Sequence, residues 1–190
     1  SVSATPGWIG RIHFDGRPRT DMVLGWDGPA RNHPDWLALR AANTALGEIG
    51  LGGRIGRVLR DEKGIADYAW TSVGGGSGPG ASFVRAGIDP GKTDEALAAI
   101  REILGAVSAE GITDAELLDA KTLLTGELAH RYETNLSIAG FLADLEHWKL
   151  GAEYPKKHAA LVDALTRERV AEAAKTWIRP DAIGVTAGPR

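Results

Sequence analysis

The sequence predicts an α+β fold, with a mainly antiparallel sheet and helices layered on one face of it. Three observations favour this class. Apolar segments of strand character come early in the chain and again at its very end, most segments with helical spacing lie between them, and the two kinds do not alternate regularly. No repeat of fixed period is visible, and the one glycine-rich run is too short for an interdomain linker. We therefore expect residues 1–190 to form one domain.

The strands are predicted from short apolar runs bounded by turn residues. Met22-Val23-Leu24 is typical of a short buried strand and follows the turn signal Asp15-Gly16-Arg17-Pro18. Segments 66–73 and 82–88 lie on either side of the glycine-rich loop 74–80, so we expect them to pair as antiparallel strands. A last short strand is expected at 183–186, because Pro180 ends the helix before it.

The helices are predicted from apolar residues that recur on one helix face and from capping residues at helix starts. Thr113 and Glu116 form a capping box, in which each side chain satisfies a free backbone N–H. Thr93 and Thr166 are predicted N-caps of two further helices. The expected helices span about 34–46, 55–63, 93–110, 114–128, 135–150, 155–163 and 166–177.

The composition argues against several partners. The chain has 22 basic and 25 acidic residues and a net charge of -3, so we expect neither nucleic acid nor an anionic membrane as a partner. No apolar run approaches the roughly 20 residues that cross a bilayer. The lack of cysteine fits a cytoplasmic and a periplasmic protein equally well, so the compartment stays open. The first residue is Ser rather than Met, which fits a domain excised from a longer chain.

Two familiar site patterns are incomplete. The chain has five histidines, but none belongs to a His-x-x-Glu-His or His-x-x-x-His pair that would place two imidazoles on one helix face. We therefore predict no metal site in this chain. Pro90-Gly91-Lys92-Thr93 resembles the end of a phosphate-binding loop, but Ala86 stands where that pattern needs its first glycine.

Segment 52–66 concentrates charge beside a flexible, glycine-rich turn. Arg54, Arg57 and Arg60 recur every three residues, so they fan over roughly one side of a helix. Their guanidinium groups could hold carbonyl or carboxylate groups of a ligand. The alternative is a solvated basic face that Asp61 and Glu62 neutralise.

This segment resembles the pitrilysin family of zinc metallopeptidases, which includes insulysin and the mitochondrial processing peptidases, in the part that follows the metal-binding domain. The family's Leu-Asn-x-x-Leu-Gly run is similar to 42–47, and its Ser-Arg-Leu to Leu-Arg-Glu-Lys-x-Gly-Leu-Ala-Tyr stretch is similar to 53–66. Later matches are Gly111-Ile112-Thr113, Glu116-Leu117 and Ala120-Lys121. The resemblance spans most of the chain and implies a mitochondrial processing peptidase-like fold.

The resemblance implies that this chain is the half that closes over a peptide held at a zinc ion, with the zinc on a homologous metal-binding half. That half would be in the same chain or in a separate subunit. The family's substrate-binding arginine falls on Arg60, with Arg54 nearby. Its tyrosine falls on Asp67, and the tyrosine present is Tyr68, one position later. Either the strand bulges by one residue or the contact of this tyrosine is lost.

Two functions therefore stay open. The first is the substrate-binding, non-catalytic half of a zinc metalloendopeptidase, in which no activity is expected from this chain alone. The second is a catalytically inactive scaffold or assembly homologue, which the Asp at position 67 favours because it would neutralise Arg60. Both imply the same fold, and a His-x-x-Glu-His motif upstream of Ser1 or in the adjacent gene would separate them.

Overall fold

The computed structural model describes residues 5–48 and 52–189. In this part of the chain, five strands form one sheet in the order β1-β5-β2-β4-β3. The pairs β2–β4, β2–β5 and β3–β4 are antiparallel, and β1–β5 is parallel. The mainly antiparallel α+β fold expected from the sequence is confirmed. The strands are β1 (Ile9–His13), β2 (Thr20–Gly28), β3 (Ala66–Val73), β4 (Gly80–Ile88) and β5 (Ile183–Gly188).

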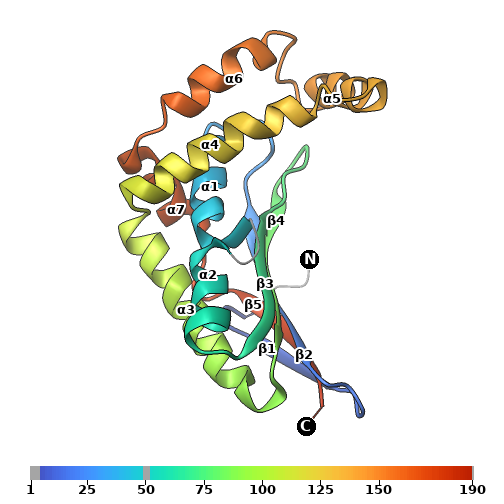
Figure 1. Cartoon of the computed structure of the whole chain (residues 1–190), viewed down its shortest axis with the longest axis vertical. Helices are drawn as coiled ribbons and strands as arrows, with labels where there is room; N and C mark the ends of the chain where they lie inside the picture. The colour runs from blue at the N-terminus through green and yellow to red at the C-terminus, as the bar shows by residue number, and fades with distance from the viewer. Residues whose placement is uncertain (1–4, 49–51, 190) are drawn as a thin grey trace.

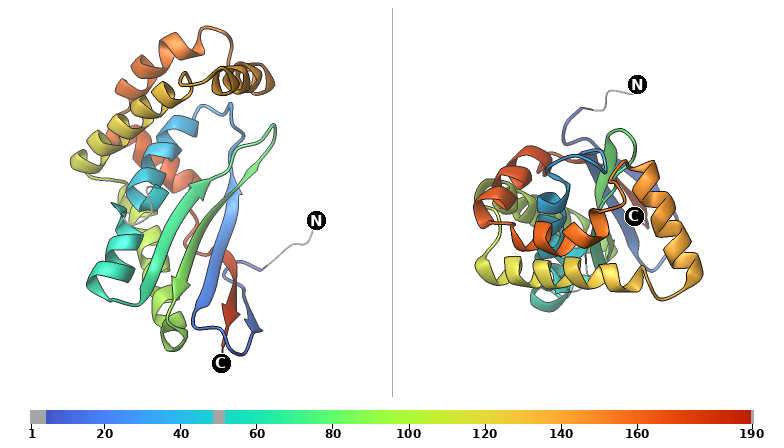
Figure 2. Two further views of the ribbon diagram at one scale, coloured as in Figure 1. Left: turned by 45° about the vertical axis from the view of Figure 1, so that its right-hand side comes forward. Right: turned by 90° about the horizontal axis from the view of Figure 1, so that it is seen from above.

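The helices cover one face of this sheet, and the other face carries none of them (Figures 1 and 2). Helix α5 projects past the sheet at the end where β3 turns into β4 (Figure 1). The helical elements are α1 (Trp36–Asn43), η1 (Thr44–Glu48), α2 (Arg54–Gly56), η3 (Arg57–Glu62), η4 (Pro90–Lys92), α3 (Thr93–Glu110), α4 (Asp114–His130), α5 (Asn135–His147), α6 (Tyr154–Asp163) and α7 (Arg167–Trp177).

The core lies between the sheet and the helices. Met22 and Leu24 of β2 are fully buried, whereas Val23 between them is 40% exposed. This alternation is what a strand shows when only one of its faces is covered. Facing these strands are the apolar stripes of the helices, with Leu39 of α1 and Ile100 of α3 almost or fully buried.

The capping predictions are confirmed at two helix starts and wrong at a third. Thr113 and Glu116 form the capping box of α4, and Thr166 caps α7. Thr93 does not cap α3: it is the first residue of that helix, and its hydroxyl donates a hydrogen bond to the Pro90 carbonyl at 2.9 Å. The preceding turn η4 begins at Pro90, and this turn displaces the helix start from the position that the capping pattern predicts.

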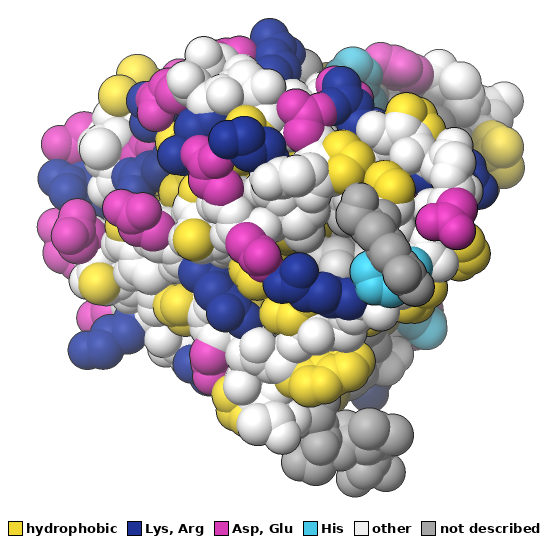
Figure 3. Space-filling view, turned by 90° about the horizontal axis from the view of Figure 1, so that it is seen from below, with side chains coloured by type: hydrophobic (Ala, Val, Ile, Leu, Met, Phe, Trp, Pro, Cys, Tyr) yellow, Lys and Arg dark blue, Asp and Glu magenta, His cyan; other side chains and the backbone are white. Residues whose placement is uncertain are grey.

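Among the described residues, no helix is both long and apolar enough to cross a lipid bilayer. The charges of both signs are mixed on the surface. Figure 3 shows acidic and basic side chains interspersed over the helices at the lower end of the molecule. Such interspersed charges produce a weaker local field than a patch of one sign would.

Candidate functional site

Strand β3 contains a bulge at Asp67. Ala66 pairs with Ile88 and Tyr68 pairs with Gly87, so Asp67 is an extra residue without a partner on β4. Without the bulge, Tyr68 would point to the same side as Ala66, into the core. With it, Ala66, Ala69 and Thr71 are buried while Tyr68 is only half-buried. Of the two alternatives that the sequence left open, the bulge is the one observed.

The bulge places Tyr68 on the side of the sheet that has no helices, here called the helix-free face. Residues that are paired across neighbouring strands share a face. The row next to Tyr68 therefore consists of Trp70, Arg85, Val23 and Val185, which are paired in this order across β3, β4, β2 and β5. Val23 and Val185 are 40% and 37% exposed, so the helix-free face presents apolar as well as charged side chains.

Tyr68 is tied to its neighbours on this face. Its ring lies over Gly87, and its hydroxyl donates a hydrogen bond to a carboxylate oxygen of Asp21. Arg85 lies 3.6 Å from the same carboxylate. Burial raises the pKa of Tyr68, and the hydrogen bond to Asp21 and the charge of Asp21 raise it further, although Arg85 opposes them. The phenol is therefore held protonated, as a hydrogen-bond donor.

Arg60 lies on η3, and its exposed side chain contacts its own neighbour. Its Nε donates to Asp61 at 3.0 Å, and Arg57 pairs with Glu62 at 2.6 Å. These are the two acidic residues that the sequence marks as neutralising the basic face. The Arg60 side chain is 45% exposed, so its ion pair with Asp61 is solvated and weak, on the order of 0–1 kcal/mol. A ligand could replace Asp61 at little cost.

The second functional hypothesis supposed that Asp67 neutralises Arg60, but the carboxylate of Asp67 pairs with another arginine. Its carboxylate pairs with Arg19, which donates from Nη2 at 2.8 Å. The same arginine also pairs with Asp89. The bulge thus turns Asp67 toward the β1–β2 connection, where Arg19 lies between two carboxylates.

Arg54 is part of a structural ion pair. Its Nε and Nη2 donate to the two oxygens of Glu116, each at 2.6 Å, and both side chains are about three-quarters buried or more. Glu116 is also the acidic member of the capping box of α4, where it accepts the Thr113 backbone N–H at 2.8 Å. Arg54 therefore joins the segment that carries Arg60 to the start of α4. Substrate binding by Arg54 stays a prediction, as it does for Arg60, Tyr68 and Asp67.

The residues that the structure describes do not form a zinc site. Among residues 5–48 and 52–189, no group of three or more His, Asp or Glu side chains could hold a metal ion. His158 illustrates why: its Nε2 is 2.8 Å from the Leu124 carbonyl and its Nδ1 is 3.1 Å from the Tyr154 hydroxyl, so both nitrogens are occupied. The other histidines lie on separate elements, His13 on β1, His33 before α1, and His130 and His147 at the ends of α4 and α5.

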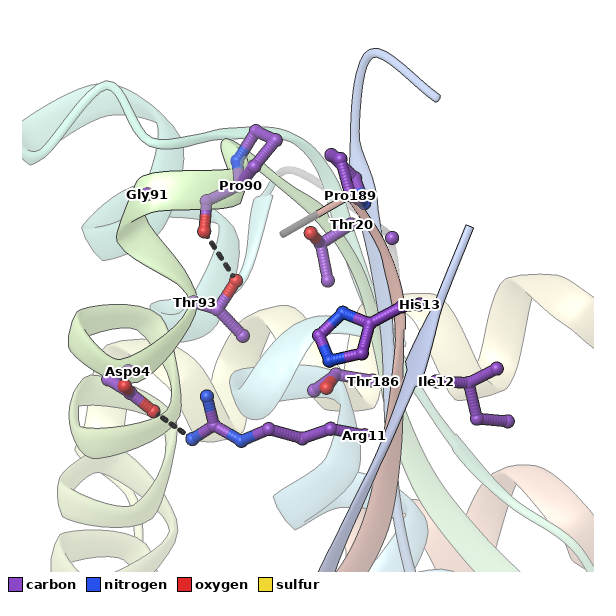
Figure 4. A pocket seen from close by; sticks show the side chains of 11 residues that line it. Arg11, Ile12, His13, Thr20, Pro90, Gly91, Thr93, Asp94, Thr186 and Pro189 are labelled. Atoms are coloured by element: carbon purple, nitrogen blue, oxygen red, sulfur yellow. Dashed lines mark hydrogen bonds and ion pairs between the residues drawn. The ribbon is translucent and has the colours of Figure 1, made fainter. Parts of the chain in front are cut away.

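The segment that resembles a phosphate-binding loop lines a small cavity of about 150 Å³ on the helix-covered side of the sheet. Figure 4 shows Arg11 crossing this cavity to pair with Asp94 at the start of α3, with the Thr93 hydroxyl turned to Pro90. Lys92 pairs with Glu95 at 3.1 Å. The groups that would hold a phosphate are therefore engaged within the chain.

The chain and its fold have relatives among known proteins. Residues 3–124 match the family model of the peptidase M16 inactive domain. The chain is 33% identical over 108 residues to an uncharacterized zinc protease of Mycobacterium leprae, a match that covers 57% of this chain and 24% of that protein. It is 31% identical over 119 residues to an uncharacterized zinc protease of Streptomyces coelicolor, covering 62% of this chain and 26% of that one.

Among solved structures, a peptidase M16 inactive domain from Pseudomonas fluorescens superposes with a TM-score of 0.87 and 25% identity, over 96% of this chain and 43% of that chain. A protease from Helicobacter pylori gives a TM-score of 0.82 at 24% identity, over 95% and 44% of the two chains. The chain thus spans about a quarter of the curated relatives and less than half of these solved chains.

Proposed function

Because the chain belongs to the peptidase M16 inactive-domain family, we propose that it is the substrate-binding half of a zinc metalloendopeptidase. In this proposal, residues 1–190 act as one domain. They close over a peptide that is held at a zinc site on a homologous metal-binding half, which lies in the same chain or in another subunit. The observation that carries the proposal is the bulge at Asp67, which directs the Tyr68 phenol to the helix-free face.

The helix-free face has the properties of a surface that another body covers. Val23, Val185 and Ile183 expose 40%, 37% and 36% of their surface there. Such neighbouring apolar side chains commonly mark an interaction surface. The Pseudomonas fluorescens chain is more than twice as long as the part that this chain covers, which leaves room for a second domain of similar size.

A peptide has a groove to occupy beside this face. A cavity of about 660 Å³ opens where β2, β4 and β5 present Gly25, Ala81 and Ile183. Gly25 has no side chain and Ala81 has only a methyl group, which leaves this space open, and its volume lies in the range that takes peptide side chains or small ligands. Trp26, Asp27, Trp177, Arg179 and Asp181 are among its other lining residues.

In this proposal Arg60 and Tyr68 donate hydrogen bonds to the peptide backbone. The guanidinium of Arg60 has a fixed charge and a planar fork, which suit a carbonyl or the oxyanion that forms when the carbonyl is attacked. The Tyr68 phenol stays protonated and can donate once it leaves Asp21. Arg54 would then be a positioning residue, because its ion pair with Glu116 fixes the helix segment that carries Arg60.

The test is reconstitution with the metal-binding half. The chain should show no turnover of a fluorogenic peptide alone, and the assembled pair should cleave it. Arg60→Ala should lower kcat/KM of the pair by about 10²-fold, the size expected for a lost oxyanion donor. Arg57→Ala removes an arginine from the same segment, one that pairs with Glu62, and should leave kcat/KM nearly unchanged. Unchanged turnover with Arg60→Ala would remove Arg60 from the site.

The second candidate is a catalytically inactive scaffold. It is favoured by the fact that Arg60 and Tyr68 both donate to carboxylates of this chain, Asp61 and Asp21, in the structure. A scaffold would bind the metal-binding half as tightly as the first candidate does, but the pair would not hydrolyse peptides. Binding measured by calorimetry without any turnover would therefore favour the scaffold.

A further inference from the structure

A separate cavity, of about 70 Å³ and open on one side, is lined by residues of α1, α4, α5 and α6 and by Arg31 and Arg131 outside these helices, at the end of the molecule where α5 projects past the sheet (Figure 1). This space can take a small head group, whose remaining part can extend into solvent because the cavity is open on one side. Four aromatic rings and three guanidinium groups line it: Trp36, Phe141, Tyr154 and His158, and Arg31, Arg40 and Arg131.

Arg31 is held by stacking rather than by an ion pair. Its guanidinium carbon lies 4.8 Å from the ring centroid of Trp36 and 6.0 Å from that of Tyr154. None of the ion pairs and side-chain hydrogen bonds within residues 5–48 and 52–189 involves the Arg31 side chain. Stacking on aromatic faces fixes the plane of a guanidinium but leaves its N–H edge free to donate. Arg31 therefore presents an oriented set of donors without an acceptor.

Trp36 lines the same cavity and carries a donor that has no partner among the described residues. The residue is only 5% exposed, and its indole Nε1 is buried without a hydrogen-bond partner. A buried N–H without a partner is unfavourable, so such a group calls for an acceptor. The opposite edge of the indole faces the β3–β4 loop, since a Cβ on Gly75 would lie 2.3 Å from a carbon of that edge.

The carboxylates near the cavity do not accept from either donor, because each binds another arginine. Glu127 accepts two hydrogen bonds from Arg40, at 2.8 and 3.0 Å, and Glu48 lies 2.6 Å from the same guanidinium. Arg131 pairs with Asp144 at 3.3 Å. Arg40 and Arg131 thus face three carboxylates, and the charge of Arg31 brings the group to neutrality while its N–H groups keep no protein acceptor among the described residues.

We propose that this cavity binds a carboxylate group, with the guanidinium of Arg31 and the indole N–H of Trp36 as donors. A carboxylate has two acceptor oxygens in one plane, which match the free edge of a guanidinium, and it fits the small volume. The group would come from a peptide, as its C-terminus or as an Asp or Glu side chain. The peptide source rests on the proposed function, but carboxylate binding does not require the metal-binding half.

The experiment titrates the ¹⁵N-labelled 190-residue chain and follows the indole N–H signals of its six tryptophans. The probes are acetyl-triglycine with a free C-terminus, its C-terminal amide, and an acetyl-Gly-Asp-Gly amide, each up to about 10 mM, enough to populate a site with a Kd near 1 mM. The signal that disappears in Trp36→Phe identifies Trp36. That signal should shift with either carboxylate probe and stay in place with the neutral amide.

Variants connect the shift to the arginine. Arg31→Gln should weaken binding about tenfold or more, as expected for a lost charged hydrogen bond, and Arg31→Lys should restore only part of the affinity, because an ammonium has no planar fork. Arg17→Gln, at an exposed arginine outside this cavity, should bind as the original chain does. Circular dichroism checks that each variant is folded.

The outcomes separate this proposal from the peptidase role. A shift with only one carboxylate probe supports the site and names the source, C-terminus or side chain. Equal shifts with the neutral amide, equal affinity in folded Arg31→Gln, or no Trp36 shift with any probe would each overturn the proposal. None of these results depends on whether the assembled pair cleaves peptides.

Discussion

Tyr68 on β3 donates its hydroxyl hydrogen bond to Asp21 on β2, across the intervening strand β4. The ring can make this crossing because Gly87 of β4, which pairs with both residues, has no side chain. A Cβ on Gly87 would lie 2.4 Å from a ring carbon of Tyr68. Three strands thus determine where this phenol lies on the helix-free face.

Replacing Asp21 by Asn should lower the pKa of Tyr68 toward its ordinary value. Burial would still raise this pKa, but the charge that opposes the phenolate would be gone. Because the folded-state pKa is raised, the stability linked to it is present below the unfolded pKa and is lost as pH rises through the folded pKa. Asp21→Asn should therefore make unfolding less sensitive to alkaline pH. Phenolate absorbance, with the Tyr68→Phe spectrum subtracted, measures the titration.

The matched control for this change is Asp27→Asn, on the same strand and the same face. Strand residues of equal parity share a face, and Asp27 lies in another row, paired with Ala81. It should leave the Tyr68 titration where it is. A Tyr68 titration that is the same in Asp21→Asn and in the original chain would contradict the hydrogen bond.

Replacing Gly87 by Ala should displace the Tyr68 ring and break its hydrogen bond to Asp21. The new methyl group has a ring carbon at 2.4 Å, so the side chain must rotate away. Gly25→Ala is the control, because its Cβ would find its nearest neighbour, the Ser82 carbonyl, at 3.6 Å. We expect Gly87→Ala to shift the Tyr68 titration as Asp21→Asn does, and Gly25→Ala to leave it unchanged. The opposite pattern would show that Gly87 is not needed for the crossing.

The sequence predicts helices, strands and their caps better than it predicts which residues pair across the fold. The capping box at Thr113 was recognisable because both of its residues lie within one helical turn. The bulge at Asp67 remained one of two alternatives, since register depends on the pairing with β4, which the β3 sequence does not contain. Arg54 was recognised as a candidate, but its partner Glu116 is 62 residues away in the sequence, beyond the reach of spacing arguments.

Replacing Glu116 by Gln should lower the free energy of unfolding at neutral pH. It should also make this free energy fall less steeply as the pH is lowered into the acid range. Burial alone would raise the pKa of Glu116, but the hydrogen bonds from Arg54 and from the Thr113 backbone outweigh it and lower the pKa. A lowered folded-state pKa contributes stability above the unfolded pKa of about 4.3, and this stability is lost as pH falls through the folded pKa. We expect a loss of about 2 kcal/mol at pH 7, the size of a charged hydrogen bond.

Urea unfolding at pH 7 and in acid measures this effect. The difference between the original chain and Glu116→Gln should shrink as the pH falls through the folded pKa, since the original carboxylate then becomes neutral too. Asp119→Asn removes an exposed carboxylate from the same helix and should change the unfolding free energy little at either pH. A pH-independent difference for Glu116→Gln would mean that its charge is not what stabilises the start of α4.

Arg40 should be the most sensitive charged residue of the helical layer. Its side chain is 17% exposed and holds both Glu48 and Glu127. Burial lowers the pKa of Arg40, but the two carboxylates outweigh it and raise it. Arg40→Met would leave both carboxylates without their cation, and breaking a buried pair in this way costs about 3–5 kcal/mol. Urea unfolding at pH 7 measures the loss, with Arg17→Met at an exposed arginine as the control.

Combining Arg40→Met with a change at either carboxylate should show which carboxylate causes most of the loss of stability. Glu48 is 22% exposed and Glu127 is 42% exposed, so water compensates Glu127 better once Arg40 is gone. Arg40→Met with Glu48→Gln should therefore recover more stability than Arg40→Met with Glu127→Gln. Equal recovery by the two double variants would mean that burial does not set the cost. No recovery by either double variant would mean that the loss in Arg40→Met comes from packing of the arginine stem, which the charge of either carboxylate does not change.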